Sequence, residues 1–326
     1  MDSSTVIVQQ IAGITTLLTL AAVALAVARR LHVPFALAMI ISGVALGAVA
    51  QIVPDGASGY LVPTIPPGII LFLFLPALTF EPALQIDLRQ LRQHIVPVLT
   101  MAVGGVITTA GVVGLAVWWL TPLDLAWSLT LGAIVSAVDP VAVMALFGRL
   151  GVRARIIGIM EGETLIGSAV AIVTSRVLVA IALTGAMTSN DMWQGAGTVA
   201  IALFGGAVIG WVTALIWGWL LSKSEGDPFV ETALTTVLAY ASYLAAELMF
   251  GTSGVTATLV AGVTLGTWGR TKIYVAVESY LDKFWDFAAA ATGATVLLLI
   301  GLTVDLTAAV TYWDVILVAI IAMIAA

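Results

Sequence analysis

Long apolar runs dominate the chain, and short segments with polar residues separate them. Ten runs reach about the 20 residues that a helix needs to cross a bilayer, and an eleventh begins near Trp313. The ten predicted spans cover residues 5–28, 34–52, 66–86, 95–120, 124–148, 156–184, 195–221, 230–250, 252–268 and 284–304. This pattern predicts an all-α polytopic membrane protein with about 11 transmembrane helices. The last helix is expected to be incomplete, because only residues 313–326 remain for it.

The composition supports this class and excludes several functions. Of the 326 residues, 61% are hydrophobic and 9% are charged, a balance that no soluble domain matches. The chain has no basic tail or patch that would suggest nucleic acid as a partner, and no glycine loop that would bind a nucleotide. Because cysteine is absent, disulfides and thiolate metal sites are excluded. We therefore expect a transporter rather than an enzyme, without a cofactor.

The basic residues are distributed unevenly between the two sides of the predicted spans. Eleven of the twelve Lys and Arg residues follow odd-numbered spans, and the loops after even-numbered spans contain none. The eleven are Arg29, Arg30, Arg89, Arg92, Arg149, Arg153, Arg155, Lys223, Arg270, Lys272 and Lys283. By the positive-inside rule the odd-numbered loops are cytoplasmic, so the N-terminus is expected outside. The lack of cysteine and of a targeting peptide favours a prokaryotic inner (plasma) membrane.

A carboxylate and a helix breaker meet within the fifth span, at Asp139 and Pro140. A charged side chain at the bilayer centre costs about 2.5–3.5 kcal/mol on insertion scales, and proline removes a backbone donor from the helix. A broken helix at this depth is tolerated where protein or a water-filled cavity satisfies the freed backbone groups. The pair therefore predicts a discontinuous helix with an ion or proton site. The alternative is that Pro140 only kinks the helix while Asp139 pairs with a buried cation.

Three more acidic residues lie within predicted spans. Glu81 is followed by a proline, which repeats the pattern in the fifth span and suggests a shared pathway. Glu161 stands in the first turn of the sixth span, where the helix dipole favours an acidic side chain. Glu163 lies deeper, shortly before Gly167-Ser168. For Glu163 we leave two interpretations open, a buried role and a role at the helix terminus.

One arginine, Arg176, falls inside the sixth span, about 30 Å along a helix from its cytoplasmic start. It either extends its side chain towards the outer interface or forms a salt bridge with a carboxylate inside the membrane. Glu247 and Asp286 stand near the ends of their spans, and we expect both to be interfacial.

This set of residues favours exchange of an alkali cation for a proton. Burial and nearby charges shift the pKa of a carboxyl group, so a buried Asp can exchange a proton for a metal ion. Oxygen ligands suit alkali cations, whereas the sequence lacks the thiolates and histidine clusters that bind transition metals. The expected substrates are therefore H+ and a monovalent cation, Na+ first, with K+ or Li+ as alternatives.

Two segments carry a paired motif. Residues 132–143 read Gly-Ala-Ile-Val-Ser-Ala-Val-Asp-Pro-Val-Ala-Val, and residues 161–168 read Glu-Gly-Glu-Thr-Leu-Ile-Gly-Ser. Further matches are residues 74–89, 253–254, 269–272 and 299–302. Together they resemble the NhaP/NHE-type sodium/proton antiporters, group 1 of the monovalent cation:proton antiporter family. The matches follow the family order along the whole chain, and their combination is specific although each alone is weak.

The resemblance implies a single transmembrane exchanger domain over residues 1–326, in which dimerisation helices and core helices are interleaved. The broken helix with Asp139 and Pro140 would cross a second broken helix, beside the span that carries Glu163. Asp139 would be an ion ligand, and Thr164 would supply a hydroxyl ligand in place of a serine. Family members are commonly homodimers in the lipid bilayer that exchange Na+ or K+ for H+ by an elevator-like movement of the core.

The remaining site residues also take their roles from the resemblance. Glu81 would contribute indirectly to the site. Ser168 stands where the family has its principal aspartate, and we count it among the ion- and proton-binding residues. Glu163 would be a structural acid that pairs with an arginine on a later helix.

The sequence departs from the family pattern within the second motif. The family's Asn-Asp pair is Gly167-Ser168 here, so the principal ion- and proton-binding aspartate is missing, and Val138 replaces a threonine. The chain also ends at Ala326, before the arginine-bearing helix, and we interpret it as a C-terminally truncated member with an incomplete core. The main hypothesis is a cation:proton antiporter. The alternatives are a degenerate, non-transporting homologue or membrane subunit, and a passive channel or transporter of another solute.

Overall fold

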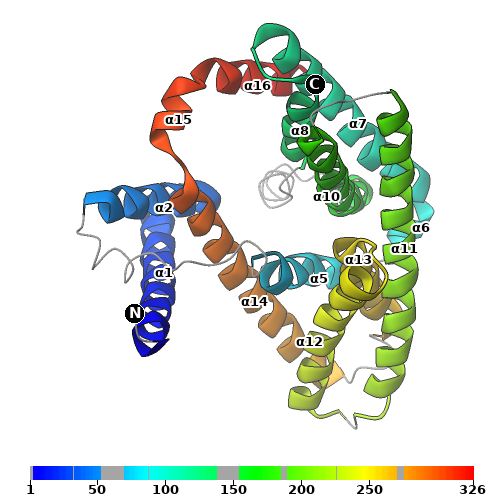
Figure 1. Cartoon of the computed structure of the whole chain (residues 1–326). Helices are drawn as coiled ribbons and strands as arrows, with labels where there is room; N and C mark the ends of the chain where they lie inside the picture. The colour runs from blue at the N-terminus through cyan, green and yellow to red at the C-terminus, as the bar shows by residue number, and fades with distance from the viewer. Residues whose placement is uncertain are drawn as a thin grey trace. The chain divides into compact units, whose positions relative to one another are not determined.

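The computed structural model describes residues 3–31, 33–52, 70–86, 88–137, 154–184, 189–224, 226–269 and 275–326 (Figure 1). The helices up to residue 135 are α1 (Ser3–Leu31), α2 (Phe35–Ile52), η1 (Ile70–Phe74), α5 (Leu75–Gln85), α6 (Leu88–Gln93), α7 (Ile95–Leu120) and α8 (Leu125–Val135). They are followed by α10 (Ala154–Leu183), α11 (Ser189–Leu221), α12 (Pro228–Leu244), η2 (Ala245–Met249), α13 (Gly254–Thr264), η3 (Leu265–Gly269), α14 (Val275–Thr303), α15 (Leu306–Thr311) and α16 (Trp313–Ala325). The elements η1, η2 and η3 are single π-helical turns. The described ranges contain no strand, which confirms the all-α class.

Each predicted span contains a helix in the structure. Within the described residues, five helical stretches are long and apolar enough to cross a membrane by length and composition. They are Ile95–Leu120, Arg155–Leu183, Trp193–Leu221, Pro228–Met249 and Val277–Thr303. The apolar helices therefore confirm the membrane class, whereas the count of eleven spans stays a prediction. The short helices α6 and α15 were not predicted, because six residues with mixed polarity give no periodic signal.

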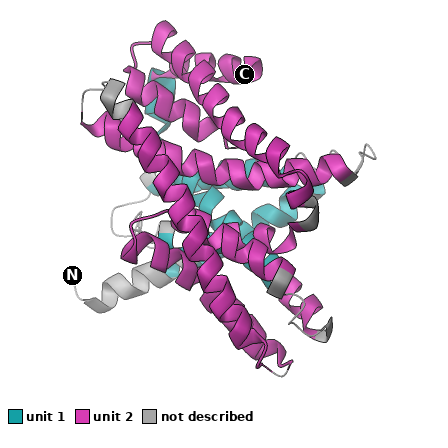
Figure 2. Cartoon of the chain, turned by 90° about the vertical axis from the view of Figure 1, so that its right-hand side faces the viewer, with its two compact units in different colours: residues 1–78, 284–311 teal, residues 79–283, 312–326 magenta. Residues whose placement is uncertain are grey.

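The chain divides into two compact units, and each unit combines segments that are distant in the sequence (Figure 2). Unit 1 comprises Met1–Leu78 and Phe284–Thr311. Unit 2 comprises Thr79–Lys283 and Tyr312–Ala326. The chain enters unit 2 within α5 and returns to unit 1 within α14, so two helices contribute residues to both units.

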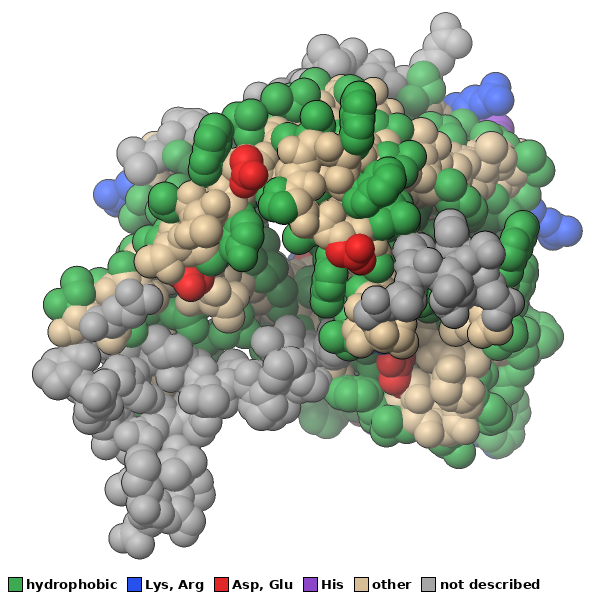
Figure 3. Space-filling view, turned by 45° about the horizontal axis from the view of Figure 1, so that its top comes forward, with side chains coloured by type: hydrophobic (Ala, Val, Ile, Leu, Met, Phe, Trp, Pro, Cys, Tyr) green, Lys and Arg blue, Asp and Glu red, His purple; other side chains and the backbone are tan. Residues whose placement is uncertain are grey.

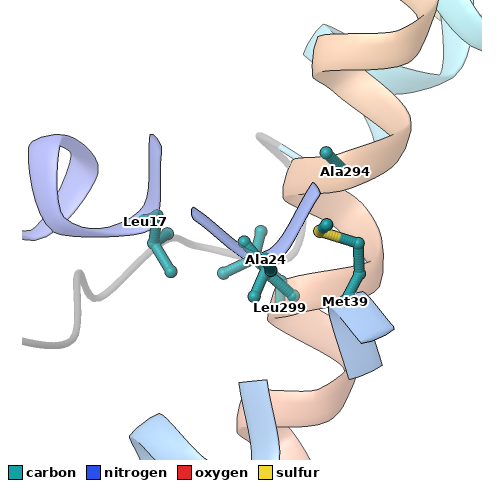
Figure 4. Close-up of a cluster of buried hydrophobic side chains, with 6 residues drawn as sticks. Leu17, Ala24, Met39, Ala294 and Leu299 are labelled. Atoms are coloured by element: carbon teal, nitrogen blue, oxygen red, sulfur yellow. The ribbon is translucent and has the colours of Figure 1, made fainter. Parts of the chain in front are cut away.

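Unit 1 is built around α1, α2 and the second half of α14. Its hydrophobic core consists of Leu17, Ala24, Met39, Ala294, Leu298 and Leu299, and Figure 4 shows five of these side chains converging from the three helices. The two helices α2 and α14 approach closely at a pair of glycines. A Cβ added to Gly43 would overlap the backbone oxygen of Leu298, and one added to Gly301 would overlap that of Ile40. Small residues at helix interfaces are the usual way for membrane helices to pack tightly.

In unit 2, α7, α8 and α10 pack against one another. The turn between α7 and α8 is fixed by Asp124, whose carboxylate accepts a hydrogen bond from the backbone N–H of Ala126 at 3.3 Å and so caps α8. Further along α8, a Cβ on Gly132 would stand 2.6 Å from the backbone oxygen of Ala110 in α7, so only glycine permits this approach. Helix α16 packs on the C-terminal part of α7, where the core consists of Val113, Val117, Val315 and Ala322.

Helices α11, α12 and α13 form the other part of unit 2. Here too the backbones approach closely, because a Cβ on Gly210 of α11 would overlap the backbone oxygen of Ala257 in α13. Ser253 caps α13 by accepting from the backbone N–H of Thr256 at 3.1 Å. The turn before this cap contains Gly251, whose φ of 61° lies in the left-handed region that glycine adopts without strain.

Large hydrophobic side chains are exposed on the surface of the described helices. Figure 3 shows one such face, on which hydrophobic side chains are common and charged side chains are few. Along α11 the exposed residues are Ile201, Phe204, Val208, Trp211, Val212, Ile216 and Trp219. Their spacing follows one side of a helix. An apolar stripe of this length on a helix that can cross a bilayer suits contact with lipid.

Candidate cation and proton site

A polar pocket opens beside the first half of α10. The helix contributes Glu163, Thr164, Gly167 and Ser168, which share one face because residues four apart stack along a helix. The rest of the lining is Gly105, Val106 and Thr109 from α7 and Ser136 from the end of α8. The pocket has a volume of about 80 Å³. Because one water needs about 10–15 Å³ of such space, a cation with some of its water fits.

Glu163 supplies the only carboxylate among the described lining residues. Its side chain is half-buried, and its Oε2 atom lies 3.4 Å from the hydroxyl oxygen of Thr164, which is longer than an ordinary hydrogen bond between oxygens. Within the described ranges, the single ion pair of the chain is elsewhere, so Glu163 has no basic side chain beside it there. Glu163 therefore faces the pocket with hydroxyl groups as its polar neighbours.

The hydroxyl groups of the pocket are oriented by their own helices. Thr164 is only 4% exposed, and its Oγ1 atom donates to the backbone oxygen of Met160 at 2.8 Å. Ser168 donates in the same way to the oxygen of Thr164 at 2.7 Å, and Ser136 to that of Ala133 at 2.7 Å. A hydroxyl has one proton and two lone pairs. Since the protons are used within the helices, the lone pairs remain as ligands for a cation.

Two glycines shape the pocket by leaving space. A Cβ on Gly167 would stand 3.7 Å from Oε1 of Glu163 and 3.8 Å from Cα of Ala102, which are ordinary contact distances. A close approach of another backbone therefore does not require this glycine. Its missing side chain instead leaves room beside the carboxylate. On the other wall, a Cβ on Gly105 would meet nothing within 4 Å.

The structure brings three of the predicted site residues together in one pocket, namely Glu163, Thr164 and Ser168. Asp139 and Pro140 lie outside the described residues, although α8 ends at Val135, four residues before Asp139, with Ser136 as its C-cap. Glu81 lies half-buried on α5, where Nε2 of Gln85 donates to its carboxylate at 2.5 Å, and it is not among the lining residues.

Sequence reasoning missed the contribution of α7 to the pocket. Gly105 and Thr109 line it, yet α7 carries no charged residue between Ile95 and Leu120 that would have drawn attention. The neighbouring Thr108 bonds to its own helix at 2.6 Å and does not line the pocket. Nothing in the sequence distinguishes these two threonines, because only the rotation of α7 in the bundle selects one of them. Ser136 lies within the first motif, but its place in the pocket was not predicted.

The second half of α10 carries a different polar arrangement. Arg176 donates from its Nη1 atom to Oε1 of Glu247, in η2, at 2.5 Å, and the other carboxylate oxygen accepts from the backbone N–H of Gly254 at 3.0 Å. Of the two interpretations for Arg176, the structure supports the salt bridge. Glu247 lies near the end of its helix, where we expected an interfacial residue. Through these two bonds it instead connects α10 to the start of α13. The buried ring of Tyr243 packs at the same point, next to Gly254.

A bundle of apolar helices with an oxygen-lined pocket next to a helix end is typical of secondary transporters. The family described as "Sodium/hydrogen exchanger, transmembrane" matches residues 16–326. The chain belongs to this family, which confirms the resemblance stated from the motifs.

Known proteins similar to this chain agree with that assignment. The Na(+)/H(+) antiporter ApNhaP of Aphanothece halophytica is 33% identical over 296 residues, which cover 90% of this chain and 54% of the relative. The Na(+)/H(+) antiporter NhaH of Halobacillus dabanensis is 30% identical over 317 residues, covering 94% and 77%. The chain thus spans about half the length of the first relative and about three quarters of the second.

A solved structure shows that the fold is shared as well. The sodium proton antiporter MjNhaP1 from Methanocaldococcus jannaschii matches with a TM-score of 0.76 at 19% identity, over 94% of this chain and 74% of that chain. This likeness confirms the antiporter fold that the motifs implied.

Proposed function

We propose that the protein exchanges a monovalent cation, Na+ first, for protons across the membrane. The observation that carries this proposal is the pocket on α10, where a carboxylate faces hydroxyl groups next to the end of α8. Carboxylate and hydroxyl oxygens are the ligands that hard cations take, and a carboxylate also binds a proton. The printed names of the relatives, which are Na(+)/H(+) antiporters, support the same function.

In this proposal the predicted residues keep their roles around the pocket. Asp139 follows the pocket residue Ser136 by three positions and acts as an ion ligand, while Pro140 keeps the helix interrupted there. The hydroxyls of Thr164 and Ser168 are further ligands. Glu81 contributes indirectly from α5, through the charge of its carboxylate. K+ and Li+ remain the alternative cations.

The setting of the protein is part of the proposal. The apolar helices and the family place it in a membrane. We further propose the plasma membrane of a prokaryote, with the N-terminus outside because of the arginine and lysine distribution, and a homodimer as the working state. Labelling of single cysteines introduced at Ser4 and Lys223, from either side of the membrane, tests the orientation, because the chain has no cysteine of its own.

Proton flux in proteoliposomes tests the exchange itself. The chain is reconstituted, a pH-sensitive dye reports the lumen, and Na+, Li+ or K+ is added outside. We expect cation-dependent proton movement that Asp139→Asn abolishes. Asp286→Asn is the matched control, because Asp286 is an exposed carboxylate of α14 outside the pocket lining. Absence of flux in the parent chain would favour the degenerate homologue, and an electrical current independent of the proton gradient would favour a channel.

A further inference from the structure

We propose that Thr109 of α7 is a ligand of the transported cation and that its hydroxyl sets the preference among Li+, Na+ and K+. This role rests on the exchange function proposed above, and it adds a residue to the wall of the pocket that α7 and the end of α8 form. Three observations support it. They concern the polarity of that wall, the register of its two helices and the hydrogen bonds of two neighbouring threonines.

The first observation is that the wall formed by α7 and the end of α8 offers few side-chain oxygens. Its described lining residues are Gly105, Val106 and Thr109 of α7 and Ser136 at the end of α8. A cation binds several oxygen ligands that surround it, and one face of α10 supplies them from one side only. Among the described lining residues of α7, Thr109 is the one with a polar side chain. A side-chain ligand from α7 is therefore Thr109.

The second observation is that Thr109 and Ser136 lie at a similar height in the bundle. A Cβ on Gly132 would stand 2.6 Å from the backbone oxygen of Ala110, so α7 and α8 meet at these two residues. From this contact Thr109 is one residue back along α7, and Ser136 is four residues on along α8. The two helices are joined by a short turn and run antiparallel, so both steps go the same way. Their heights therefore differ by about 4.5 Å, and both hydroxyls belong to one wall.

The third observation is a difference between two adjacent threonines of α7. Thr108 is exposed and donates to the backbone oxygen of Gly104 at 2.6 Å, a usual bond of threonine within a helix. Thr109 is half-buried in the pocket lining, and its hydroxyl makes no such bond within α7, all of which is described. A hydroxyl that is not bonded to its own helix keeps its proton and both lone pairs for other groups. Thr109 can thus bind a cation, or a water of its hydration shell, without breaking a bond.

An oxygen ligand in this position affects the choice among alkali cations. It attracts a small cation more strongly than a large one, because the attraction between charges grows as their distance falls. A small cation also gives up its water less readily, so it depends more on the oxygens that replace this water. Removing the oxygen of Thr109 should therefore weaken the binding of Li+ and Na+ more than that of K+. A side chain that only packs α7 against its neighbours would affect the three cations alike.

Cation-dependent thermal stability of the purified chain tests the ligand without a membrane. A cation that binds the folded state raises the melting temperature. The chain is melted in detergent at increasing LiCl, NaCl or KCl, with choline chloride keeping the ionic strength constant. We expect Thr109→Val to need about tenfold more Na+ than the parent for the same rise in melting temperature, and the change for K+ to be smaller. Thr109→Ser keeps the hydroxyl and should respond as the parent does.

Thr108→Val is the matched control, because the same substitution one residue earlier removes a hydroxyl outside the described lining. It should leave the response to Na+ unchanged. Melting of Thr109→Val in choline chloride near that of the parent shows that the fold is kept, and Thr109→Ala gives the same comparison if valine disturbs the packing. The role of Thr109 is overturned if both valine variants respond to Na+ alike, or if Thr109→Val changes the response to all three cations by the same factor.

Proton flux in proteoliposomes separates a failure of this role from a failure of the exchange function. If the parent shows cation-dependent flux and Thr109→Val leaves the KM for Na+ unchanged, the exchange stands and Thr109 is not a ligand. If Na+ stabilises the parent but drives no flux, the exchange function is overturned, while the melting of the valine variants still decides whether Thr109 binds the cation. A parent chain with neither response overturns both.

Discussion

The two halves of α10 hold their acidic partners in opposite ways. In the first half, Glu163 faces a pocket and has hydroxyls, but no basic side chain of the described residues, beside it. In the second half, about 20 Å further along the helix, Arg176 binds Glu247, which also accepts a backbone N–H from Gly254. The same chemical group is thus left available at one point and fully engaged at the other.

This difference suits Glu163 to the proposed transport site and Glu247 to a structural role. An arginine is positively charged at all physiological pH values, and its ion pair with Glu247 holds two helices together. In the proposed exchange, a cation in the pocket supplies the opposite charge for the carboxylate of Glu163. Arg176 thus links α10 to η2 and, through Glu247, to α13, whereas Glu163 lines the pocket.

Placing an arginine in the pocket should abolish exchange. Gly105 lines the pocket opposite α10, and a side chain there has open space, since a Cβ would meet nothing within 4 Å. In Gly105→Arg the guanidinium would enter the pocket near the carboxylate of Glu163, and its fixed positive charge would repel an entering cation. We expect cation-dependent proton flux in proteoliposomes to fall to background. Gly105→Gln, which adds a long neutral side chain, should retain most of the flux, and equal loss in both variants would contradict the charge argument.

Breaking the ion pair between Arg176 and Glu247 should reduce the stability of the fold more than the exchange activity. Exposed pairs contribute about 0–1 kcal/mol, and removal of one partner of a buried pair costs about 3–5 kcal/mol. The side chains of Arg176 and Glu247 are 36% and 21% exposed, an intermediate case. We therefore expect Arg176→Ala to lower the free energy of unfolding by about 1–3 kcal/mol, measured by melting in detergent. Proton release on addition of Na+ should persist, because the pocket is distant.

A double variant tests whether the loss comes from the charge left behind. Arg176→Met with Glu247→Met removes both charges, and its melting temperature should lie above that of Arg176→Ala. A double variant less stable than the single one would show instead that the hydrogen bond to Gly254 carries most of the stability.

Removing a hydroxyl from the pocket should weaken cation binding moderately. Thr164→Val keeps the shape of the side chain and removes the oxygen that lies in the pocket lining. One lost oxygen contact of about 1–1.5 kcal/mol corresponds to a KM for Na+ that is about tenfold higher, with a smaller change in maximal rate. Thr164→Ser keeps the hydroxyl and should recover most of the affinity. A KM unaffected by Thr164→Val would remove Thr164 from the ligands.

The smallest effect is expected at an exposed carboxylate of unit 1. Asp305 precedes α15, and its side chain accepts from the hydroxyl of Thr307 at 2.6 Å and from the backbone N–H groups of Thr307 and Ala308. These bonds hold the pKa of Asp305 below its ordinary value of 3.8, and the bond from the Thr307 hydroxyl has the largest effect. Because the folded state has the lower pKa, the cap is complete above the ordinary value and is lost as the pH falls through the lowered pKa.

Amide hydrogen exchange of residues 306–311 checks this cap. Protection in the parent chain should decrease on acidification from pH 6 to below the lowered pKa of Asp305, after correction for intrinsic exchange. In Asp305→Asn the protection should not depend on pH in this range, because no group titrates at the cap. The same acid dependence in both chains would assign the loss to another group.

Much of the architecture could be predicted because it depends on local composition. Apolar runs of sufficient length form helices in a membrane, so each predicted span contains one, although the start of α14 lies at Val275, nine residues before the predicted boundary. Those nine residues include charged side chains such as Glu278 and Lys283, which interrupt the hydropathy signal without interrupting the helix. Helix α8 ends at Val135, and the predicted interruption at Asp139 and Pro140 lies outside the described residues.

The candidate site could be predicted only in part. Glu163, Thr164 and Ser168 were found from the motif because they share one helix face, which follows from their spacing. Thr109 and Gly105 were not found, because they come from α7 and nothing in their own sequence marks the side that faces α10. Glu247 was expected at an interface, because its distance from the helix end was visible and its partner, 71 residues away in the sequence, was not.

The sequence by itself determined the membrane class, the helical segments and the family of this protein, since each depends on residues that are close together along the chain or on motifs within one segment. Only the tertiary structure decided that Arg176 belongs to Glu247 and that Glu163 belongs to a pocket lined by hydroxyls. The physical reason is that a helix presents several faces, and the packing of neighbouring helices selects the partner of each. The charge state that a carboxylate can adopt depends on that partner.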